Sequence, residues 1–234
     1  MEAEMKKMES TAKLKLLAVF AIVMIIASGL IVLYFESIKN NSQAGPVTRV
    51  ACVGDSITEG FGYPNKLEMM LGNNYTVGNF GVGGSTVLLN TSKPYINQAA
   101  MQRAKEYHPD IVVIMLGTND ASPAYDQYVG GFANDYKKLI GEFEALKGKP
   151  KIWLVKPPPI FINENGLDNK ILVHDVIPRI ELTANNLGLP TIDMYAALAS
   201  PPDYFWDGVH PNNQGVELIA SEVYKAISTS ALQR

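Results

Sequence analysis

Short apolar runs alternate along the chain with segments whose apolar residues recur at helical spacing. Each run is bounded by glycine, proline or polar residues, which is typical of a strand buried on both faces. The strands expected from these runs are 50–53, 75–80, 111–116, 151–156 and 191–193, and the expected helices are 63–71, 98–107, 126–146, 171–187 and 216–227. Strands that alternate with helices predict an α/β fold, in which a parallel sheet carries helices on both faces.

The longest apolar run lies near the N-terminus and predicts a transmembrane helix. Residues 16–35 carry no charge over about 20 positions, which is the length that a helix needs to cross a bilayer. A secretory signal peptide is the alternative, with a small-residue cleavage site at 27–29, but the run continues through Phe35 and exceeds a usual signal core. We therefore favour an uncleaved anchor, followed by a flexible tether of small and polar residues over 36–47.

The distribution of basic residues predicts the orientation of this helix. Four lysines lie within residues 1–15, whereas only Lys39 and Arg49 follow the span closely. The positive-inside rule then places residues 1–15 in the cytoplasm as a short tail. The remaining domain, 48–234, is expected to be extracytoplasmic, or secreted if the N-terminal segment is cleaved.

Composition limits the number of domains and the classes of partner. About 185 of the 234 residues remain after the N-terminal segment, which is enough for one domain with a sizeable core. A formal net charge of -3 provides no basic surface for nucleic acid. The single cysteine, Cys52, excludes an internal disulfide and a multi-cysteine metal site, and its place in an apolar run predicts a core residue.

Polar or glycine-rich clusters follow the first three expected strands. Ser56 comes directly after the first strand, where open α/β sheets bind ligands, and a serine there suits an acyl-transfer nucleophile. A plain helix cap is the alternative for this serine. A glycine-rich turn at 81–86 and a polar cluster at 117–120 follow the next two strands. Because loops after parallel strands open at one edge, we expect Ser56, Gly84 and Asn119 to converge.

A candidate base lies shortly before the closing helix. Asp207 precedes His210 by three residues, so the carboxylate can orient the imidazole and stabilise its protonated form. The other histidines, His108 and His174, lie away from the carboxyl edge of the expected sheet and are interpreted as structural. Asp120 is an alternative partner for His210, but Asp207 is preferred because it is close in sequence.

Four sequence blocks, taken in order, resemble those of the GDSL or SGNH hydrolase family. They are Gly54-Asp55-Ser56-Ile57, Asn79 through Gly84, Gly117-Thr118-Asn119-Asp120 and Asp207-Gly208-Val209-His210-Pro211. Together they span nearly all of the chain from Arg49 onward. The resemblance implies a flavodoxin-like three-layer sandwich with about five parallel strands, and an esterase activity that needs neither a metal nor an organic cofactor.

The same resemblance implies a role for five residues. Ser56 is the expected nucleophile, His210 the base and Asp207 its partner. The backbone amides of Ser56 and Gly84 and the side chain of Asn119 are expected to form an oxyanion hole. The choice of Gly84 among the glycines of its turn rests on its spacing from the asparagine that begins the second block.

The expected substrate is an O-acetylated carbohydrate, because the chain most resembles the single-domain carbohydrate esterases of the family, those similar to acetylxylan and sialate O-acetylesterases. Tyr204, Phe205 and Trp206 adjoin the catalytic pair and either stack on a sugar or pack against the final helix. A lysophospholipase or acyl-thioesterase of the same family is one alternative. A non-catalytic glycan-binding module is an alternative of another class.

Overall fold

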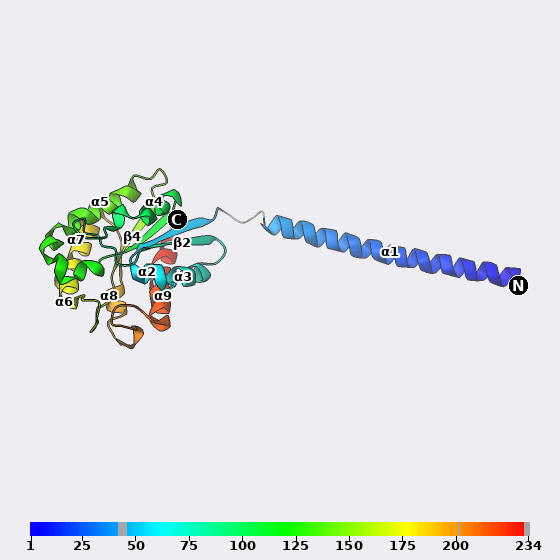
Figure 1. The fold of residues 1–234 in the computed structure, drawn as a ribbon. Helices are drawn as coiled ribbons and strands as arrows, with labels where there is room; N and C mark the ends of the chain where they lie inside the picture. Colours follow the sequence, from blue (N-terminus) through cyan, green and yellow to red (C-terminus); the bar gives the residue numbers. More distant parts are fainter. Residues whose placement is uncertain (42–45, 201, 232–234) are drawn as a thin grey trace. The chain divides into compact units, whose positions relative to one another are not determined.

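The computed structural model describes residues 1–41, 46–200 and 202–231. The chain divides into two compact units, Met1–Pro46 and Val47–Arg234, and each is described by itself (Figure 1). The first unit consists of one long helix. The second contains a sheet, its covering helices and every candidate site residue.

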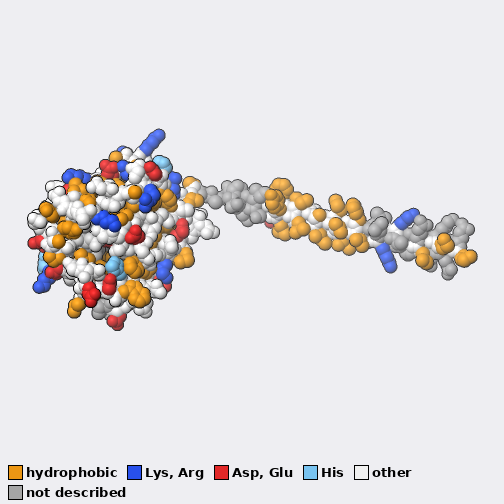
Figure 2. Space-filling model, viewed as in Figure 1, with side chains coloured by type: hydrophobic (Ala, Val, Ile, Leu, Met, Phe, Trp, Pro, Cys, Tyr) orange, Lys and Arg blue, Asp and Glu red, His pale blue; other side chains and the backbone are white. Residues whose placement is uncertain are grey.

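Helix α1 spans Glu2–Asn41 and contains a window long and apolar enough to cross a membrane. This window, Val19–Glu36, has a mean hydropathy of 2.4 and none of it is buried (Figure 2). The same length and composition also fit a signal sequence. The helix continues into the segment expected as a tether, because no glycine or proline interrupts it there. Residues 42–45 of that segment lie outside the described residues.

The second unit is built around a parallel sheet of five strands in the order β2-β1-β3-β4-β5. The strands are β1 Thr48–Gly54, β2 Tyr75–Gly81, β3 Ile111–Met115, β4 Lys151–Lys156 and β5 Thr191–Asp193. This is the strand order of flavodoxin-like sheets, in which the first strand lies beside the point where the order reverses. The expected α/β fold with five parallel strands is confirmed, and each strand has nearly the predicted ends.

Helices cover both faces of the sheet. One face carries α4 Ala99–Glu106, α5 Phe132–Glu144 and α7 Ile177–Leu187, and the other carries α3 Tyr63–Leu71, α8 Met194–Ala197 and α9 Asn213–Ala231 (Figure 1). Alternate residues of β1 supply the two cores: Ala51 and Val53 face the α5 side, and Val50 and Cys52 the α9 side. Burial on both faces explains why β1 and β3 read as continuous apolar runs.

Cys52 is a core residue, as its sequence context predicted. Its side chain is fully buried in β1, and this burial raises the pKa of the thiol to about 12. The thiol therefore stays protonated and is not a reactive group at neutral pH.

The prediction of a helix over 126–146 is wrong at the N-terminal end of that range. Pro123–Gly131 forms a 3₁₀ segment, η3, and the α-helix α5 begins only at Phe132. The adjacent glycines Gly130 and Gly131 explain the shift, because glycine loses the most backbone entropy on entering a helix.

The helix expected over 171–187 is not uniform either. It consists of the short α6 Asn169–Ile171, a π-helical turn Leu172–Val176 (η4) and α7. Pro178 lies in the first turn of α7, where its missing N–H removes no helical hydrogen bond. The wider π turn directly before it lets the chain follow a nearly continuous helical path in spite of the proline.

The remaining short elements lie in the connections between the longer strands and helices. They are α2 Ser56–Gly60, η1 Tyr95–Asn97, η2 Asn119–Ala121 and η5 Pro202–Tyr204. Two of them, α2 and η2, directly follow β1 and β3 in the sequence, so they begin at neighbouring positions of this edge.

Candidate active site

Ser56 begins α2 in a tight turn after β1. A Cβ on Gly54 would collide with the Thr58 side chain and lie 2.8 Å from the Met115 carbonyl oxygen, so glycine is required there. The helix cap is Asp55, whose carboxylate accepts a hydrogen bond from the Ile57 amide at 3.0 Å. Asp55 therefore performs the capping role that was the alternative for Ser56, and the serine hydroxyl remains available for other contacts.

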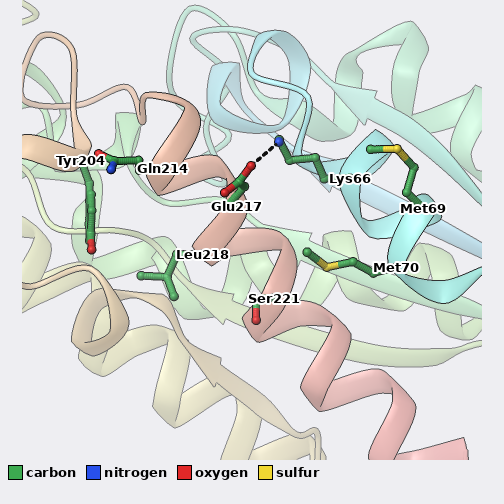
Figure 3. A pocket seen from close by; sticks show the side chains of 8 residues that line it. All are labelled: Lys66, Met69, Met70, Tyr204, Gln214, Glu217, Leu218 and Ser221. Atoms are coloured by element: carbon green, nitrogen blue, oxygen red, sulfur yellow. Dashed lines mark hydrogen bonds and ion pairs between the residues drawn. The ribbon is translucent and has the colours of Figure 1, made fainter.

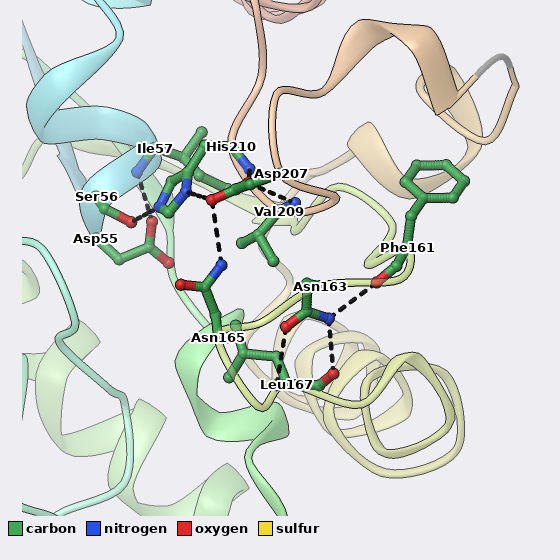
Figure 4. Close-up of polar contacts among 10 residues, drawn as sticks. All are labelled: Asp55, Ser56, Ile57, Phe161, Asn163, Asn165, Leu167, Asp207, Val209 and His210. Atoms are coloured by element: carbon green, nitrogen blue, oxygen red, sulfur yellow. Dashed lines mark hydrogen bonds and ion pairs between the residues drawn. The ribbon is translucent and has the colours of Figure 1, made fainter.

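The hydroxyl of Ser56 points to His210. Ser56 Oγ lies 2.9 Å from His210 Nε2, and His210 Nδ1 lies 2.8 Å from Asp207 Oδ2 (Figure 4). The serine and the histidine are 154 residues apart in sequence and meet at the carboxyl edge of the sheet. With Nδ1–H donated to Asp207, the neutral ring presents the lone pair of Nε2 to the serine hydroxyl.

Asp207 is held as a carboxylate by converging donors. Its Oδ1 accepts from the amides of Val209 at 3.0 Å and His210 at 2.8 Å, and its Oδ2 accepts from Asn165 Nδ2 at 3.2 Å. Partial burial raises the pKa of Asp207, but these bonds and the one from the His210 ring outweigh it and hold the pKa well below its usual range. The carboxylate can therefore orient the imidazole and stabilise its cation.

The turn that carries Asp207 and His210 packs directly against the loop after β4. Gly208 has a φ of +82°, and a Cβ there would collide with the carbonyl oxygen of Ile162. The amide of Phe161 donates to the Gly208 carbonyl at 2.7 Å. Glycine is thus required for both the turn and the close approach of the loop.

The loop after β4 is held in shape by Asn163. Its Nδ2 donates to the carbonyl oxygens of Phe161 at 2.8 Å and Leu167 at 3.0 Å, and its Oδ1 accepts from the Leu167 amide at 3.3 Å (Figure 4). These bonds close the loop on itself and present Asn165 to Asp207. Asn165 could not be predicted from the sequence, where its surroundings indicate only a polar turn.

The histidine ring is also restrained from the side of α2. Phe61, directly after α2, stacks on His210 with ring centroids 5.1 Å apart and planes inclined by 25°. This contact was not predicted from the sequence either. The stacking and the bond to Asp207 leave the imidazole little freedom to turn away from Ser56.

The glycine-rich loop after β2 passes next to Ser56. A Cβ on Gly83 would lie 3.6 Å from Ser56 Cβ. The amide of Gly83 donates to Glu59 Oε2 at 2.8 Å, and the amide of Gly81 donates to an asparagine side chain at 2.9 Å. Gly84 has a φ of +74°, and its amide has no acceptor among the hydrogen bonds of the described residues. Of the three glycines, Gly84 is thus the one with an amide left for a ligand.

Asn119 approaches the same place from the end of β3. It is the first residue of η2, and its Nδ2 donates to the Ser85 carbonyl at 3.0 Å. An amide group carries two hydrogens, so one donor of Asn119 is left after this bond. The bond joins the loops after β2 and β3, and it places the Asn119 amide beside Gly84 and its free N–H.

Asp120 and Asp55 make no hydrogen bond to His210 in the part of the chain that is described. Asp120 is fully buried and accepts from the amides of Val87 at 3.0 Å and Leu88 at 2.8 Å. Burial raises the pKa of Asp120 to about 7 and that of Asp55 to about 6. Both carboxyl groups bind backbone amides of the turns around the site. Of the three aspartates, Asp207 is the one that contacts the histidine.

The other histidines lie elsewhere. His108 has a φ of +51° in the turn before β3, and His174 lies in the π turn η4. No group of three or more His, Cys, Asp or Glu side chains that could hold a metal ion occurs within the described ranges. Ser56, His210 and Asp207, with donors at Gly84 and Asn119, form an arrangement suited to acyl transfer through a serine nucleophile.

Solved structures of similar fold include the native aryl esterase of M. smegmatis, with a TM-score of 0.66 and 18% sequence identity. A carbohydrate acetylesterase from Sinorhizobium meliloti has a TM-score of 0.64 and 19% identity. Each comparison covers 78% of this chain and 99% of the solved chain. At these identities the likeness concerns the fold alone.

Similarity in sequence is more specific. An acetylxylan esterase from Xylanibacter ruminicola is 37% identical, over 76% of this chain and 43% of that protein, so this chain spans less than half of its relative. The sequence profile of GDSL-like lipases and acylhydrolases matches residues 52–218, which include Ser56, the glycine-rich loop, Asn119 and the turn with Asp207 and His210. Since this match extends over most of the chain, the protein belongs to the GDSL-like Lipase/Acylhydrolase family.

Proposed function

We propose that this chain is a serine esterase that hydrolyses carboxylic esters through an acyl-enzyme, and that its substrate is an O-acetyl group on a carbohydrate. The observation that carries the proposal is the pair of contacts made by His210. Its two ring nitrogens lie 2.9 Å from Ser56 Oγ and 2.8 Å from Asp207 Oδ2, so one imidazole can take a proton from the serine while the carboxylate stabilises the cation.

In the acylation half-reaction, Ser56 Oγ attacks the ester carbonyl carbon while Nε2 of His210 accepts the hydroxyl proton. The carbonyl oxygen becomes an oxyanion and accepts hydrogen bonds from the amides of Ser56 and Gly84 and from the second Asn119 Nδ2 hydrogen. When the intermediate collapses, the bond to the alcohol oxygen breaks and His210 gives its proton to that oxygen. The products are a free alcohol and an acetyl group on Ser56.

Deacylation repeats these steps with water. His210 removes a proton from the water molecule as its oxygen attacks the acetyl carbon, and the same donors hold the second oxyanion. Collapse returns the proton from His210 to Ser56 Oγ and releases acetate. Because Asp207 remains ionised throughout, it stabilises the imidazolium in both halves of the cycle.

The names of similar proteins support an acetylated carbohydrate as the substrate. The relative at 37% identity is an acetylxylan esterase, and one solved structure of the same fold is a carbohydrate acetylesterase. Ser56 is only partly buried, which suits a polymeric or branched ester better than a long buried acyl chain.

We further propose that α1 anchors the enzyme in a membrane, with residues 1–15 in the cytoplasm and the catalytic domain outside. The apolar window Val19–Glu36 supports the anchor, and the lysines before it support the orientation. An extracytoplasmic esterase on a membrane would act on glycans at the cell surface or on those brought to it.

The substrate proposal is tested with the full-length protein in detergent, assayed on p-nitrophenyl esters from acetate to a long acyl chain, with Ser56→Ala as control. We expect kcat/KM to be highest on acetate, and activity to fall at least about 10³-fold in the control. A maximum at long chains would contradict the acetyl ester and favour a lipase or acyl-thioesterase. Absence of activity on every ester would contradict the enzyme itself and favour a binding module.

A further inference from the structure

A hollow of about 560 Å³ lies beside Asp207. Its walls are Ile162–Asn165, from the loop after β4, and Trp206–Gly208, from the turn that carries the catalytic carboxylate. A volume of this size accommodates a small ligand or one unit of a polymer. Asp207 lines this hollow and also contacts His210, which contacts Ser56, so the hollow adjoins the candidate active site.

One wall carries an exposed tryptophan. The two aromatic residues before it pack into the domain: Phe205 is buried and Tyr204 is half-buried against the core beneath α9. Trp206 is 70% exposed, so it does not serve the packing that was one of its two predicted roles. Its backbone is nevertheless fixed, because its amide donates to the His210 carbonyl at 2.8 Å. A large apolar ring is thus carried by a fixed stretch of backbone next to Asp207 and remains open to solvent.

The opposite wall carries three polar residues beside the fully exposed apolar side chain of Ile162. Asn163 holds the loop, and the neighbouring Glu164 and Asn165 are exposed. Asn165 uses its Nδ2 on Asp207, but neither its Oδ1 nor the Glu164 carboxylate has a donor among the hydrogen bonds of the described residues. This wall therefore offers acceptors to hydroxyl groups. An acyl chain in the same place would cover these polar groups without satisfying them.

We propose that this hollow is a sugar-binding subsite, in which Trp206 stacks on the apolar face of a pyranose ring while Glu164 and Asn165 accept hydrogen bonds from its hydroxyl groups. His210 protonates the leaving alcohol, so the alcohol side of the ester lies toward His210 and Asp207. The subsite holds the sugar unit next to the one that carries the acetyl group. This inference rests on the proposed esterase function and makes an acetylated oligosaccharide a better substrate than an isolated acetate ester.

The test compares Trp206→Ala, Trp206→Phe and the wild-type full-length protein on p-nitrophenyl acetate and on acetylated xylo-oligosaccharides. We expect Trp206→Ala to lower the ratio of oligosaccharide to p-nitrophenyl acetate kcat/KM about tenfold, through KM, and Trp206→Phe to keep part of it because it retains an aromatic face. An unchanged ratio, or an equal loss on both substrates, would overturn the subsite while leaving the esterase intact.

The control variant is taken from a second hollow, between α3 and α9, where an exposed side chain can be truncated in the same way (Figure 3). This hollow is lined by Lys66, Met69, Met70, Tyr204, Gln214, Glu217, Leu218 and Ser221 and includes no residue of the Ser56, His210 and Asp207 group. Met69 is 74% exposed there, much like Trp206. Met69→Ala is expected to leave the substrate ratio unchanged, and a shift equal to that of Trp206→Ala would overturn the assignment.

Calorimetry separates the subsite from the reaction. Ser56→Ala is titrated with acetylated xylo-oligosaccharide, and the double variant Ser56→Ala/Trp206→Ala is titrated in the same way. We expect binding about tenfold weaker in the double variant. Equal binding would overturn the subsite. If the wild-type protein released acetate from neither substrate, the proposed function would fail, and calorimetry would still decide whether Trp206 binds the sugar.

Discussion

At the scale of single residues, the candidate oxyanion hole depends on which donors are already used. Gly81 and Gly83 have acceptors for their amides, whereas Gly84 has none among the described residues. Asn119 spends one hydrogen on Ser85 and keeps the other. The bond to Ser85 also fixes the plane of the Asn119 amide, so its remaining donor is held in place before any substrate binds.

Asn119→Ala removes the side-chain donor and should lower kcat on p-nitrophenyl acetate by about 10² to 10³-fold, with a much smaller change in KM. The reason is that the donor acts on the oxyanion, which exists only in the transition state and the intermediate. Steady-state kinetics measures the split. Asn185→Ala, an exposed asparagine on α7, is the matched control. A loss confined to KM would show that Asn119 binds the ground state instead.

The buried carboxyl groups predict a pH dependence of stability. Burial raises the pKa of Asp120 to about 7 and that of Asp55 to about 6, whereas unfolded aspartate titrates near about 3.9. Between these values the folded protein binds more protons than the unfolded chain, so stability should fall as pH rises from about 4 to about 7. Asp207, with its lowered pKa, contributes the opposite trend only below about pH 4.

Thermal unfolding at a series of pH values checks this expectation. The melting temperature should be lower at pH 7.5 than at pH 5, and Asp120→Asn should remove most of the difference because it removes the largest titration. Asp126→Asn, at an exposed position of η3, should retain the wild-type trend. A melting temperature that rose between pH 5 and pH 7.5 would show that these carboxyl groups are not protonated in the folded domain.

At the scale of elements, the site depends on the contact between two loops. The loop after β4 and the turn of Asp207 and His210 meet at Gly208, where both a positive φ and the nearby Ile162 carbonyl exclude a side chain. The same contact presents Asn165 to Asp207 and forms the two walls of the proposed sugar subsite. A change in the backbone conformation at Gly208 would therefore move both His210 and the walls of the proposed sugar subsite.

Gly208→Ala should destabilise the domain by about 2 kcal/mol and lower activity on p-nitrophenyl acetate about tenfold or more, because the turn must open to relieve the collision. Chemical denaturation and steady-state kinetics measure the two effects. At Gly148, φ is not positive and an added Cβ would have nothing within 4 Å, so Gly148→Ala is the matched control and should be nearly neutral. Equal stability of the two variants would contradict the packing described for Gly208.

The sequence predicted the elements best where burial alone decides them. The inner strands β1 and β3 were found because parallel strands covered on both faces are continuous apolar runs. The helices over 126–146 and 171–187 were drawn as uniform, because apolar spacing does not show how Gly130, Gly131 and Pro178 divide a helical path. Tertiary contacts and backbone freedom decide those boundaries.

For the site, the sequence supplied residues that stand in short motifs. Ser56, Asn119, Asp207 and His210 were candidates from their blocks, and the structure places His210 within hydrogen-bonding distance of both the serine and the aspartate. Phe61 and Asn165 were missed. Phe61 stacks on His210 and Asn165 bonds to Asp207 only through folding, since 149 and 42 positions separate these pairs in sequence. No local spacing encodes such contacts.

At the scale of the whole molecule, two units with different surfaces share one chain. The surface of α1 between Val19 and Glu36 is apolar and exposed, whereas the second unit buries its apolar residues in two cores around the sheet. An exposed apolar helix of this length is stable in a lipid bilayer and not in water. In the proposed anchor, lipid would surround this apolar surface.

The full-length protein should therefore fractionate with membranes and resist alkaline extraction, and a variant that lacks residues 1–46 should not. Protease added outside intact cells should degrade the catalytic domain and spare a tag at the N-terminus, because the lysines before the span favour the cytoplasm. Immunoblotting against each end measures both. A soluble mature protein that begins after residue 27 would contradict the anchor and identify a cleaved signal sequence.

We claim that His210 activates Ser56 as a nucleophile, and covalent labelling measures this activation. The full-length protein is treated with a fluorophosphonate, which reacts with activated serines, and the adduct is located by mass spectrometry. We expect one adduct on Ser56 in the wild type, none in Ser56→Ala, and strongly slowed labelling in His210→Ala. An unlabelled wild type, or labelling that does not depend on His210, would contradict the claim.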